Sequence, residues 1–220
     1  MTRLAALLAV FCLPLSALAA DAPVAADQPL PAVHAGRDYA VLVPAQPTSA
    51  GPDKIEVIEF FWYGCPHCFA FEPFVEKWLE SKPDNVVFRR VPAVINPAWK
   101  LLARAWYVAK ALGVTDTMHK ALFDAIHVDH RQITSVTELE QFFVDHGVSK
   151  EQFDNTYHSF EVDNQMRRAT ELAQRYQVTA VPTMIVNGKY RTDGSFVRTY
   201  DGLMKITEAL VAKEEKAVGH

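Results

Sequence analysis

The pattern of hydrophobic and polar positions divides the chain into a strand–helix–strand unit, a long helical middle and a strand–strand–helix unit. Residues 54–63, KIEVIEFFWY, are mostly apolar on both parities, which is typical of a strand covered on both faces. The pattern turns helical from Pro66 to about Ser81, and NVVFRRV from Asn85 predicts a second strand. Strand, helix and strand in close succession predict a βαβ unit with a parallel pair of strands.

From Pro97 to about Tyr176 nothing in the pattern indicates a strand, and helical segments follow one another. Breaks between them are marked by Gly113 and Gly147 and by the candidate N-caps Thr115, Ser135 and Ser149. The helices expected in this block cover 98–112, 116–126, 136–146, 150–159 and 163–176.

The last part of the chain predicts a hairpin and a helix. The segment VPTMIVNGKYRTDG holds two strand-like runs around Asn187-Gly188, a pair suited to a type I′ turn. A final helix is expected from Asp201 to about Lys216. The whole order is βαβ, then helices, then ββα, which predicts an α/β fold.

The first nineteen residues have the three parts of a secretory signal peptide. Arg3 supplies the positive start, LAALLAVFCLPL is apolar, and Ala17-Leu18-Ala19 is a small-x-small cleavage site. The apolar run is shorter than the roughly 20 residues of a spanning helix, and Pro14 interrupts it. We therefore expect export, with a mature chain that begins at Ala20 and a flexible Ala/Pro-rich lead segment over residues 20–36.

Composition and charge place the chain among globular proteins without nucleic-acid partners. The 220 residues are 50% hydrophobic and 22% charged, enough to bury a sizeable core. Loss of the signal peptide removes Arg3 and no acidic residue, so the net charge goes from −4 to −5. The largest basic clusters are the pairs Arg89-Arg90 and Arg167-Arg168, which we expect to be solvated surface.

Cysteine usage favours redox chemistry. Cys12 lies in the signal peptide, so the mature chain holds only Cys65 and Cys68. A single C-x-x-C pair is not a disulfide scaffold, and closing so short a loop removes little chain entropy from the unfolded state. A C-x-x-C beside a βαβ pattern is typical of thiol–disulfide exchange.

The CPHC motif lies where the first strand gives way to the first helix. Cys65 is expected near the helix N-cap, where unpaired backbone N–H groups and the helix dipole stabilise a thiolate and lower its pKa. Pro66 suits the first helical turn, and protonated His67 adds a positive charge. Cys68, one turn further, should be buried, less acidic and able to attack a mixed disulfide.

Metal binding is the alternative chemistry for these residue types. The C-x-x-C could be half of a zinc site, but the mature chain offers no second C-x-x-C or H-x-x-x-H. His127 and His130 could form a metal pair, although a polar helix end is the simpler interpretation. We therefore expect no metal.

The element order, CPHC at the first helix and VPT at the start of the second half resemble the thioredoxin superfamily. The helical insertion, with FFWYGCPHCFAFEP and VPTMIVNGKY, resembles the DsbA family of bacterial periplasmic oxidants, over nearly all of the mature chain. The resemblance implies a thioredoxin-like fold with an inserted all-helical subdomain. Its parts would be residues 37–96 and 163–220, with the insertion at 97–162.

The resemblance also implies roles for residues outside the motif. Val181-Pro182 would be a cis peptide bond beside Cys65, in the groove that receives a substrate strand, whereas an ordinary trans proline is the alternative. Glu59 would be a buried acid that accepts a proton from Cys68, with a pKa raised by burial. A carboxylate at a solvated rim is the alternative for Glu59.

Four further residues lie near the motif. Glu72 and the helix-kinking Pro73 are expected to be structural rather than catalytic. Trp62 and Tyr63 suit either the core or the lining of the groove.

These inferences predict a periplasmic thiol:disulfide oxidoreductase of a Gram-negative bacterium. It would donate its Cys65–Cys68 disulfide to newly exported proteins. A stabilised Cys65 thiolate favours the reduced form and so makes the disulfide oxidising, a logic for which DsbA is itself the standard example. The resemblance implies reoxidation by the membrane quinone reductase DsbB and no bound cofactor beyond the disulfide, and we expect a monomer.

Two other functions stay open. A disulfide isomerase or reductase of the same superfamily would use the same atoms, but such isomerases carry an N-terminal dimerisation domain, for which the lead segment is too short. A peptide-binding chaperone with an idle disulfide belongs to a different class.

Overall fold

The computed structural model describes residues 29–218. The expected signal peptide and residues 20–28 of the lead segment therefore lie outside the described residues. Within residues 29–218 no helix is both long and apolar enough to cross a membrane.

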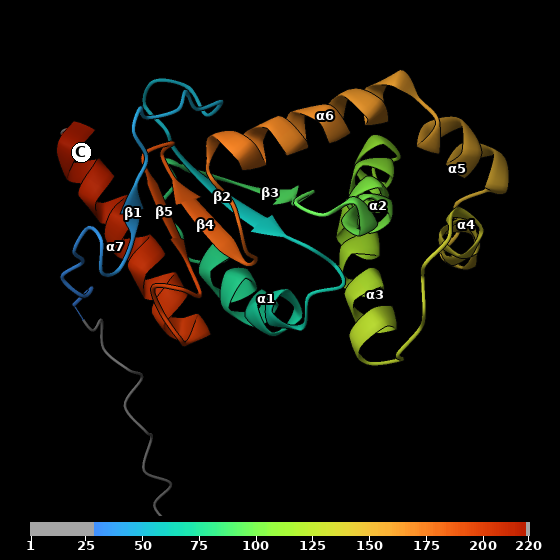
Figure 1. Cartoon of the computed structure of the whole chain (residues 1–220), viewed down its shortest axis with the longest axis horizontal. Helices are drawn as coiled ribbons and strands as arrows, with labels where there is room; N and C mark the ends of the chain where they lie inside the picture. The colour runs from blue at the N-terminus through green and yellow to red at the C-terminus, as the bar shows by residue number, and fades with distance from the viewer. Residues whose placement is uncertain (1–28, 219–220) are drawn as a thin grey trace, which may run out of the picture.

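A five-stranded sheet with the order β1-β5-β4-β2-β3 holds the first and last parts of the chain together (Figure 1). As predicted, β2 and β3 are parallel and every residue of β2 is buried, while the other neighbours pair antiparallel. The edge strand β1 was not predicted, because two residues cannot display an alternation. The strands are β1 (Ala40–Val41), β2 (Ile55–Phe61), β3 (Val86–Pro92), β4 (Thr183–Val186) and β5 (Tyr190–Asp193).

All the helices predicted from the periodicity are present. Between β3 and β4 the described chain is helical, as expected, and a short 3-10 helix, η1 (Pro97–Trp99), precedes the first helix of that block. The α-helices are α1 (Pro66–Leu79), α2 (Lys100–Ala111), α3 (Thr115–His127), α4 (Val136–Asp145), α5 (Lys150–Tyr157), α6 (Phe160–Arg175) and α7 (Tyr200–Val218).

Two of the predicted caps are confirmed and one is wrong. Ser135 and Ser149 both cap their helices, each with a reciprocal capping box. Thr115 is not a cap, because α3 already begins to bond at Val114, whose carbonyl oxygen accepts the N–H of Met118 at 3.0 Å. Helix α6 begins before the predicted Asp163, because Ser159 accepts the Val162 N–H at 3.2 Å and so caps a helix that starts at Phe160.

The Asn187-Gly188 pair forms the predicted hairpin turn between β4 and β5. Both residues have positive φ, 49° and 66°, as a type I′ turn requires, and the Lys189 N–H donates to the Val186 carbonyl at 3.0 Å. A Cβ on Gly188 would lie 2.1 Å from the carbonyl oxygen of Gln46. The turn therefore needs glycine for space as well as for conformation.

Helices cover both faces of the sheet (Figure 1). Helices α1 and α7 pack on one face, around a core cluster that includes Val57, Phe71 and Leu210. The other cluster begins on the opposite face with Phe60 and runs without interruption into the helical block, as far as Phe153 in α5. The helical block and the sheet thus share one core.

Candidate active site

The CPHC motif lies at the start of α1, as predicted. Cys65 is the N-cap in an extended conformation, Pro66 is the first helical residue, and the N–H groups of Cys68 and Phe69 donate to the Cys65 carbonyl at 3.1 and 3.2 Å. Cys65 keeps 9% of its surface exposed and Cys68 none, and both are free thiols. An attacking group can therefore reach only the first cysteine.

The two thiols differ sharply in acidity. The pKa of Cys65 is lowered to about 6, chiefly by a hydrogen bond from the Cys68 thiol and then by the backbone N–H groups of Cys68 and His67, against the effect of burial. The charge of His67 is the smallest of these causes. Burial raises the pKa of Cys68 well above its usual value. The helix end and the second thiol thus contribute more than the imidazole expected from the sequence.

A pocket of about 400 Å³ opens beside the motif. It is lined by His67, the loop before β4 and the segment that leads into α7. The Val181-Pro182 bond is cis, as the resemblance implied, and the Val181 carbonyl oxygen lies 3.6 Å from the Cys65 Sγ. The Val43-Pro44 bond is also cis, which the sequence did not lead us to expect. On the His67 side, Nδ1 of the imidazole lies 2.9 Å from the Tyr200 hydroxyl.

Glu59 is fully buried in β2, on the sheet face that α1 covers. Its Oε2 accepts from Arg90 Nε at 3.1 Å, and its Oε1 is buried without a hydrogen-bond partner among the described residues. Burial and then the nearby Glu72 raise its pKa to about 7, which Arg90 opposes. The charge of Glu59 is in turn one cause of the raised pKa of Cys68. The solvated-rim alternative for Glu59 is therefore wrong.

The prediction that Arg89 and Arg90 are solvated surface is also wrong for Arg90. The parallel register places Arg90 opposite Glu59, and its side chain is only 11% exposed. Its guanidinium also bonds Glu72 at 3.0 Å and Glu76 at 2.8 Å. Arg89 is about one-third exposed and pairs with the buried Glu56 at 3.0 Å. Each arginine thus pairs with one of the two carboxyl groups that β2 buries.

Glu72 lies in contact with both the buried arginine and the helical block. Its Oε2 accepts from Arg90 and lies 3.1 Å from Nε2 of His119, on α3. Its side chain is 15% exposed, and burial raises its pKa to about 7. Glu72 therefore connects the buried acid under α1 with the helical block. Pro73 follows it inside α1.

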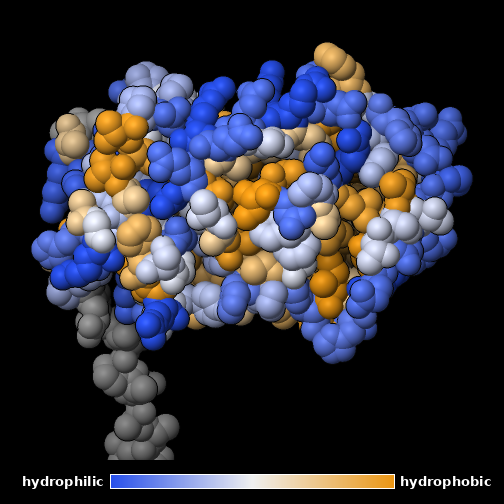
Figure 2. All heavy atoms as spheres, viewed as in Figure 1, coloured by the Kyte–Doolittle hydropathy of each residue, from blue (hydrophilic) through white to orange (hydrophobic). Residues whose placement is uncertain are grey.

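The two aromatic residues before the motif lie in different environments. Tyr63 belongs to the core, with 1% exposure and its hydroxyl 3.0 Å from Nδ1 of His119. Trp62 is half-buried and stacks on Trp99, with ring centroids 4.4 Å apart. On the face of the molecule shown in Figure 2, apolar surface gathers in the middle, between the sheet and helices α2 and α3.

The two histidines considered as a metal pair have different surroundings. His127 Nε2 lies 2.7 Å from the Tyr63 carbonyl oxygen, and its ring stacks on Phe69. His130 lies beyond the end of α3, with φ 55°. Within residues 29–218 no group of three or more His, Cys, Asp or Glu side chains is arranged to hold a metal ion.

Sequence reasoning missed three residues of this site, which are Arg90, His119 and Tyr200. For Arg90 a signal was available, because two acids in one predicted strand and two arginines in its parallel neighbour indicate paired charges. His119 and Tyr200 come from distant segments that only the fold brings to the motif.

Comparisons with known proteins agree with this geometry. A family model described as a DSBA-like thioredoxin domain matches residues 56–204. The thiol:disulfide interchange protein DsbA of Pseudomonas aeruginosa is 43% identical over 183 residues, which cover 83% of this chain and 86% of the relative. DsbA of Azotobacter vinelandii is 40% identical over 84% of this chain and 86% of the relative.

Solved structures give the same result at the level of the fold. A crystal structure of Pseudomonas aeruginosa DsbA superposes with a TM-score of 0.80 at 41% identity and covers 86% of this chain and 97% of that one. With the matching family model, the curated relatives and the placement of CPHC beside a cis-proline, the chain belongs to the DsbA-like thioredoxin family.

Proposed function

We propose that this chain is a dithiol oxidase that transfers its Cys65–Cys68 disulfide to newly exported proteins. The observation that carries the proposal is the asymmetry of the two thiols. Cys65 has a lowered pKa, is partly exposed and lies next to the pocket at Pro182. Cys68, on α1, is fully buried and has a raised pKa. An acidic Cys65 is a good leaving group and stabilises the dithiol form, which makes the disulfide a strong oxidant.

The reaction proceeds by two displacements. A substrate thiolate attacks Cys65 Sγ, the Cys65–Cys68 bond breaks, and Cys68 leaves as a thiolate that takes up a proton. A second substrate thiolate then attacks the substrate sulfur of the mixed disulfide, and Cys65 leaves as a thiolate. Two electrons pass from the substrate to the protein, which is left as a dithiol.

Glu59 fits the role of proton donor to Cys68. Its pKa of about 7 keeps a large share of the protonated form near neutral pH, whereas an ordinary glutamate would be ionised. In the reverse reaction the same carboxylate accepts the Cys68 proton, which is the role that the resemblance implied.

The pocket at Val181 and Pro182 is the proposed substrate site. The last residues before β4 run beside Cys65, so an extended substrate segment can lie along this backbone while its cysteine reacts. His67 and Tyr200 line the same pocket.

The setting of the reaction is also part of the proposal. The signal-like first nineteen residues support export to the periplasm. The dithiol must then be reoxidised, for which we propose a membrane quinone reductase of the DsbB type. The chemistry needs no cofactor besides the cysteine pair, and the chain acts as a monomer.

Oxidation of a reduced peptide that holds two cysteines tests the function directly. The oxidised protein should convert the peptide to its disulfide form, and Cys65→Ser should abolish the reaction. The redox equilibrium with glutathione should lie far towards the reduced protein. Rearrangement of a scrambled protein without net oxidation would favour an isomerase, and activity that survives Cys65→Ser would favour a chaperone.

A further inference from the structure

We propose that His119, in the helical block, is a positioning residue for the thiol–disulfide reaction, because it places the proton shared by two buried carboxyl groups on Glu59, beside Cys68, rather than on Glu72. The inference rests on the proposed function, because it names the residue that keeps Glu59, the proton donor to Cys68, in its protonated form. It adds a residue of α3 to the buried carboxyl groups and guanidinium that β2, α1 and β3 contribute.

The two carboxyl groups have one buried guanidinium between them. Arg90 donates from Nε to Glu59 and from Nη2 to Glu72, at 3.1 and 3.0 Å. Its remaining partner, Glu76, is 60% exposed and is stabilised by water as well. One positive charge does not offset two buried negative charges, and both pKa values are raised to about 7. Near neutral pH the pair therefore retains about one proton.

His119 is a neutral imidazole held at both ring nitrogens. It is 8% exposed, with Nδ1 at 3.0 Å from the Tyr63 hydroxyl and Nε2 at 3.1 Å from Glu72 Oε2. Burial, and then the charge of Arg90, lower its pKa to about 3. A neutral imidazole has a single N–H, so one nitrogen must accept and the other must donate.

The Tyr63 hydroxyl decides which nitrogen accepts. Burial raises the pKa of Tyr63, so the phenol keeps its hydrogen, and His119 Nδ1 is its hydrogen-bond partner among the described residues. Tyr63 therefore donates to Nδ1, and Nε2–H donates to Glu72. The opposite tautomer would leave a buried hydroxyl hydrogen without an acceptor.

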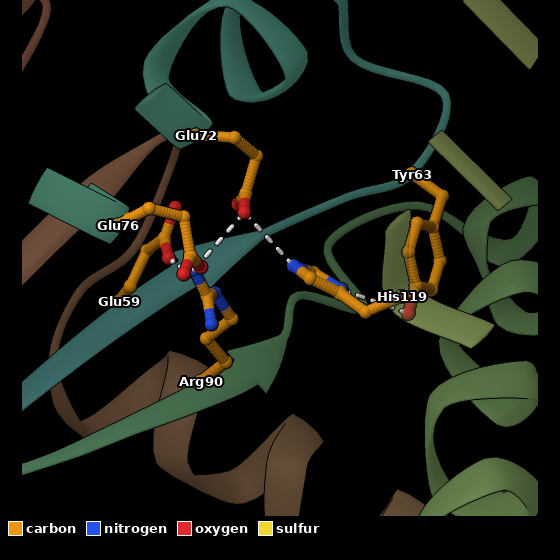
Figure 3. Close-up of polar contacts among 6 residues, drawn as sticks. All are labelled: Glu59, Tyr63, Glu72, Glu76, Arg90 and His119. Carbon is orange, nitrogen blue, oxygen red and sulfur yellow. Dashed lines mark hydrogen bonds and ion pairs between the residues drawn. The ribbon is translucent and has the colours of Figure 1, made fainter. Parts of the chain in front are cut away.

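The resulting hydrogen bonds distinguish the two carboxyl groups. Glu72 Oε2 accepts from both Arg90 and His119, between which it lies in Figure 3, whereas Glu59 accepts from Arg90 alone. Hydrogen bonds to the charged form favour ionisation, and the small exposure of Glu72 acts in the same direction. The proton therefore resides on Glu59, which accepts fewer hydrogen bonds and is fully buried.

The placement of the proton matters when the protein disulfide is attacked. Cys68 then leaves as a thiolate, Glu59 gives up its proton to that sulfur, and the new Glu59 carboxylate faces Arg90. If the proton were on Glu72 instead, Glu59 would already be anionic when the Cys68 thiolate forms. Two negative charges would then be buried close together, which raises the activation barrier for attack on the disulfide.

Several charged and titratable groups face His119 and would contribute to any pH dependence. They are Glu59 on β2, Tyr63 after it, Glu72 and Glu76 on α1, Arg90 on β3, and Asp116 on α3. The ring also packs edge-on against Phe61, Trp106 and Phe123, so a phenyl ring suits the same space.

Carbon-13 titration of the glutamate carboxyl groups in the reduced, folded protein tests the proposal, with His119→Phe and His119→Gln as a matched pair. Phenylalanine keeps the packing and loses both hydrogen bonds, whereas the glutamine amide can accept from Tyr63 and donate to Glu72. In His119→Phe the pKa of Glu72 should rise and that of Glu59 should fall, each by about one unit, which is about a tenfold change in the protonation ratio of each group. His119→Gln should titrate as the wild type does.

Peptide oxidation gives the functional readout. The pH above which the rate falls should move down by about one unit in His119→Phe and stay in place in His119→Gln. Unchanged carboxyl titrations in His119→Phe, or equal shifts in both variants, would overturn the proposal. Failure of wild-type oxidation would instead refute the proposed function, because the carboxyl titration does not depend on activity.

Nitrogen-15 spectra of the wild-type imidazole provide a test that needs no variant. We expect a neutral His119 with its hydrogen on Nε2 at neutral pH. A hydrogen on Nδ1, or a doubly protonated ring, would refute the proposed chain of hydrogen bonds even if His119→Phe failed to fold.

Discussion

Replacement of Cys68 by alanine should raise the pKa of Cys65 more than any change at His67. The Cys68 thiol is the largest cause of the lowered pKa, and the His67 charge is the smallest of those named. A hydrogen bond to a charged group contributes about 1.5–3 kcal/mol, which corresponds to roughly one to two pKa units. We therefore expect Cys65 in Cys68→Ala to titrate between ~7 and ~8, instead of about 6.

The lowered pKa also sets the oxidising power. A fall from 9.0 to about 6 is a difference of ~4 kcal/mol between the protonation states, of which ~1.4 kcal/mol, or ~30 mV for two electrons, is realised at pH 7. Because the folded-state pKa is depressed, this stabilisation of the reduced form is complete above about pH 9. It is lost as the pH falls through about 6.

The assay is the rate of iodoacetamide alkylation of Cys65 as a function of pH, in the mature chain. Cys68→Ser is the matched control, because its hydroxyl can still donate to the thiolate and should keep the pKa near the wild-type value. His67→Ala should raise the pKa only slightly. An unchanged midpoint in Cys68→Ala, or a larger shift in His67→Ala, would refute the ranking of these contributions.

Three further outcomes are expected from stability measurements in urea. The raised pKa of Glu59 stabilises the fold only while its carboxyl group is protonated, so the wild type should lose up to ~3 kcal/mol relative to Glu59→Gln as the pH rises from about 4.5 to 7. Equal dependence of stability on pH in the two proteins would contradict a buried acid. Gly188→Ala should cost at least ~1–3 kcal/mol, since its Cβ would collide with a backbone oxygen, whereas Gly194→Ala, which meets nothing within 4 Å, should cost little. Ser135→Ala should cost ~1 kcal/mol through loss of the α4 capping box, and no measurable change would show that the cap is dispensable.

The sequence predicted the fold well where its signals are local. The apolar run of β2, the periodicity of the helices, Ser135 and Ser149 as caps and the Asn187-Gly188 turn all depend on neighbours along the chain. β1 escaped prediction because two residues contain no period, and its partner β5 is almost 150 residues away. The start of α6 was misjudged because Ser159 suits a cap as well as the end of the preceding helix.

In the candidate site, too, some features follow from neighbouring residues along the chain and others from tertiary packing. The positions of Cys65 and Pro66 at the helix start follow from the motif itself. The acidity of Cys65, by contrast, depends mainly on Cys68, and the protonation of Glu59 depends on Arg90 and Glu72, which approach through tertiary packing. His119 carries no local pattern that separates it from an ordinary core histidine. Only its distances to Tyr63 and Glu72 reveal a role.

The core shared by the sheet and the helical block limits how such a protein can be altered. Phe60 on the sheet and Phe153 in α5 belong to one continuous cluster, so removal of the block would expose the apolar face that it covers. The block is therefore not a cassette that can be deleted or exchanged between thioredoxin-like proteins while its host stays intact. Recombination at its two ends must carry over matching sheet residues, and the two parts are expected to unfold in a single transition.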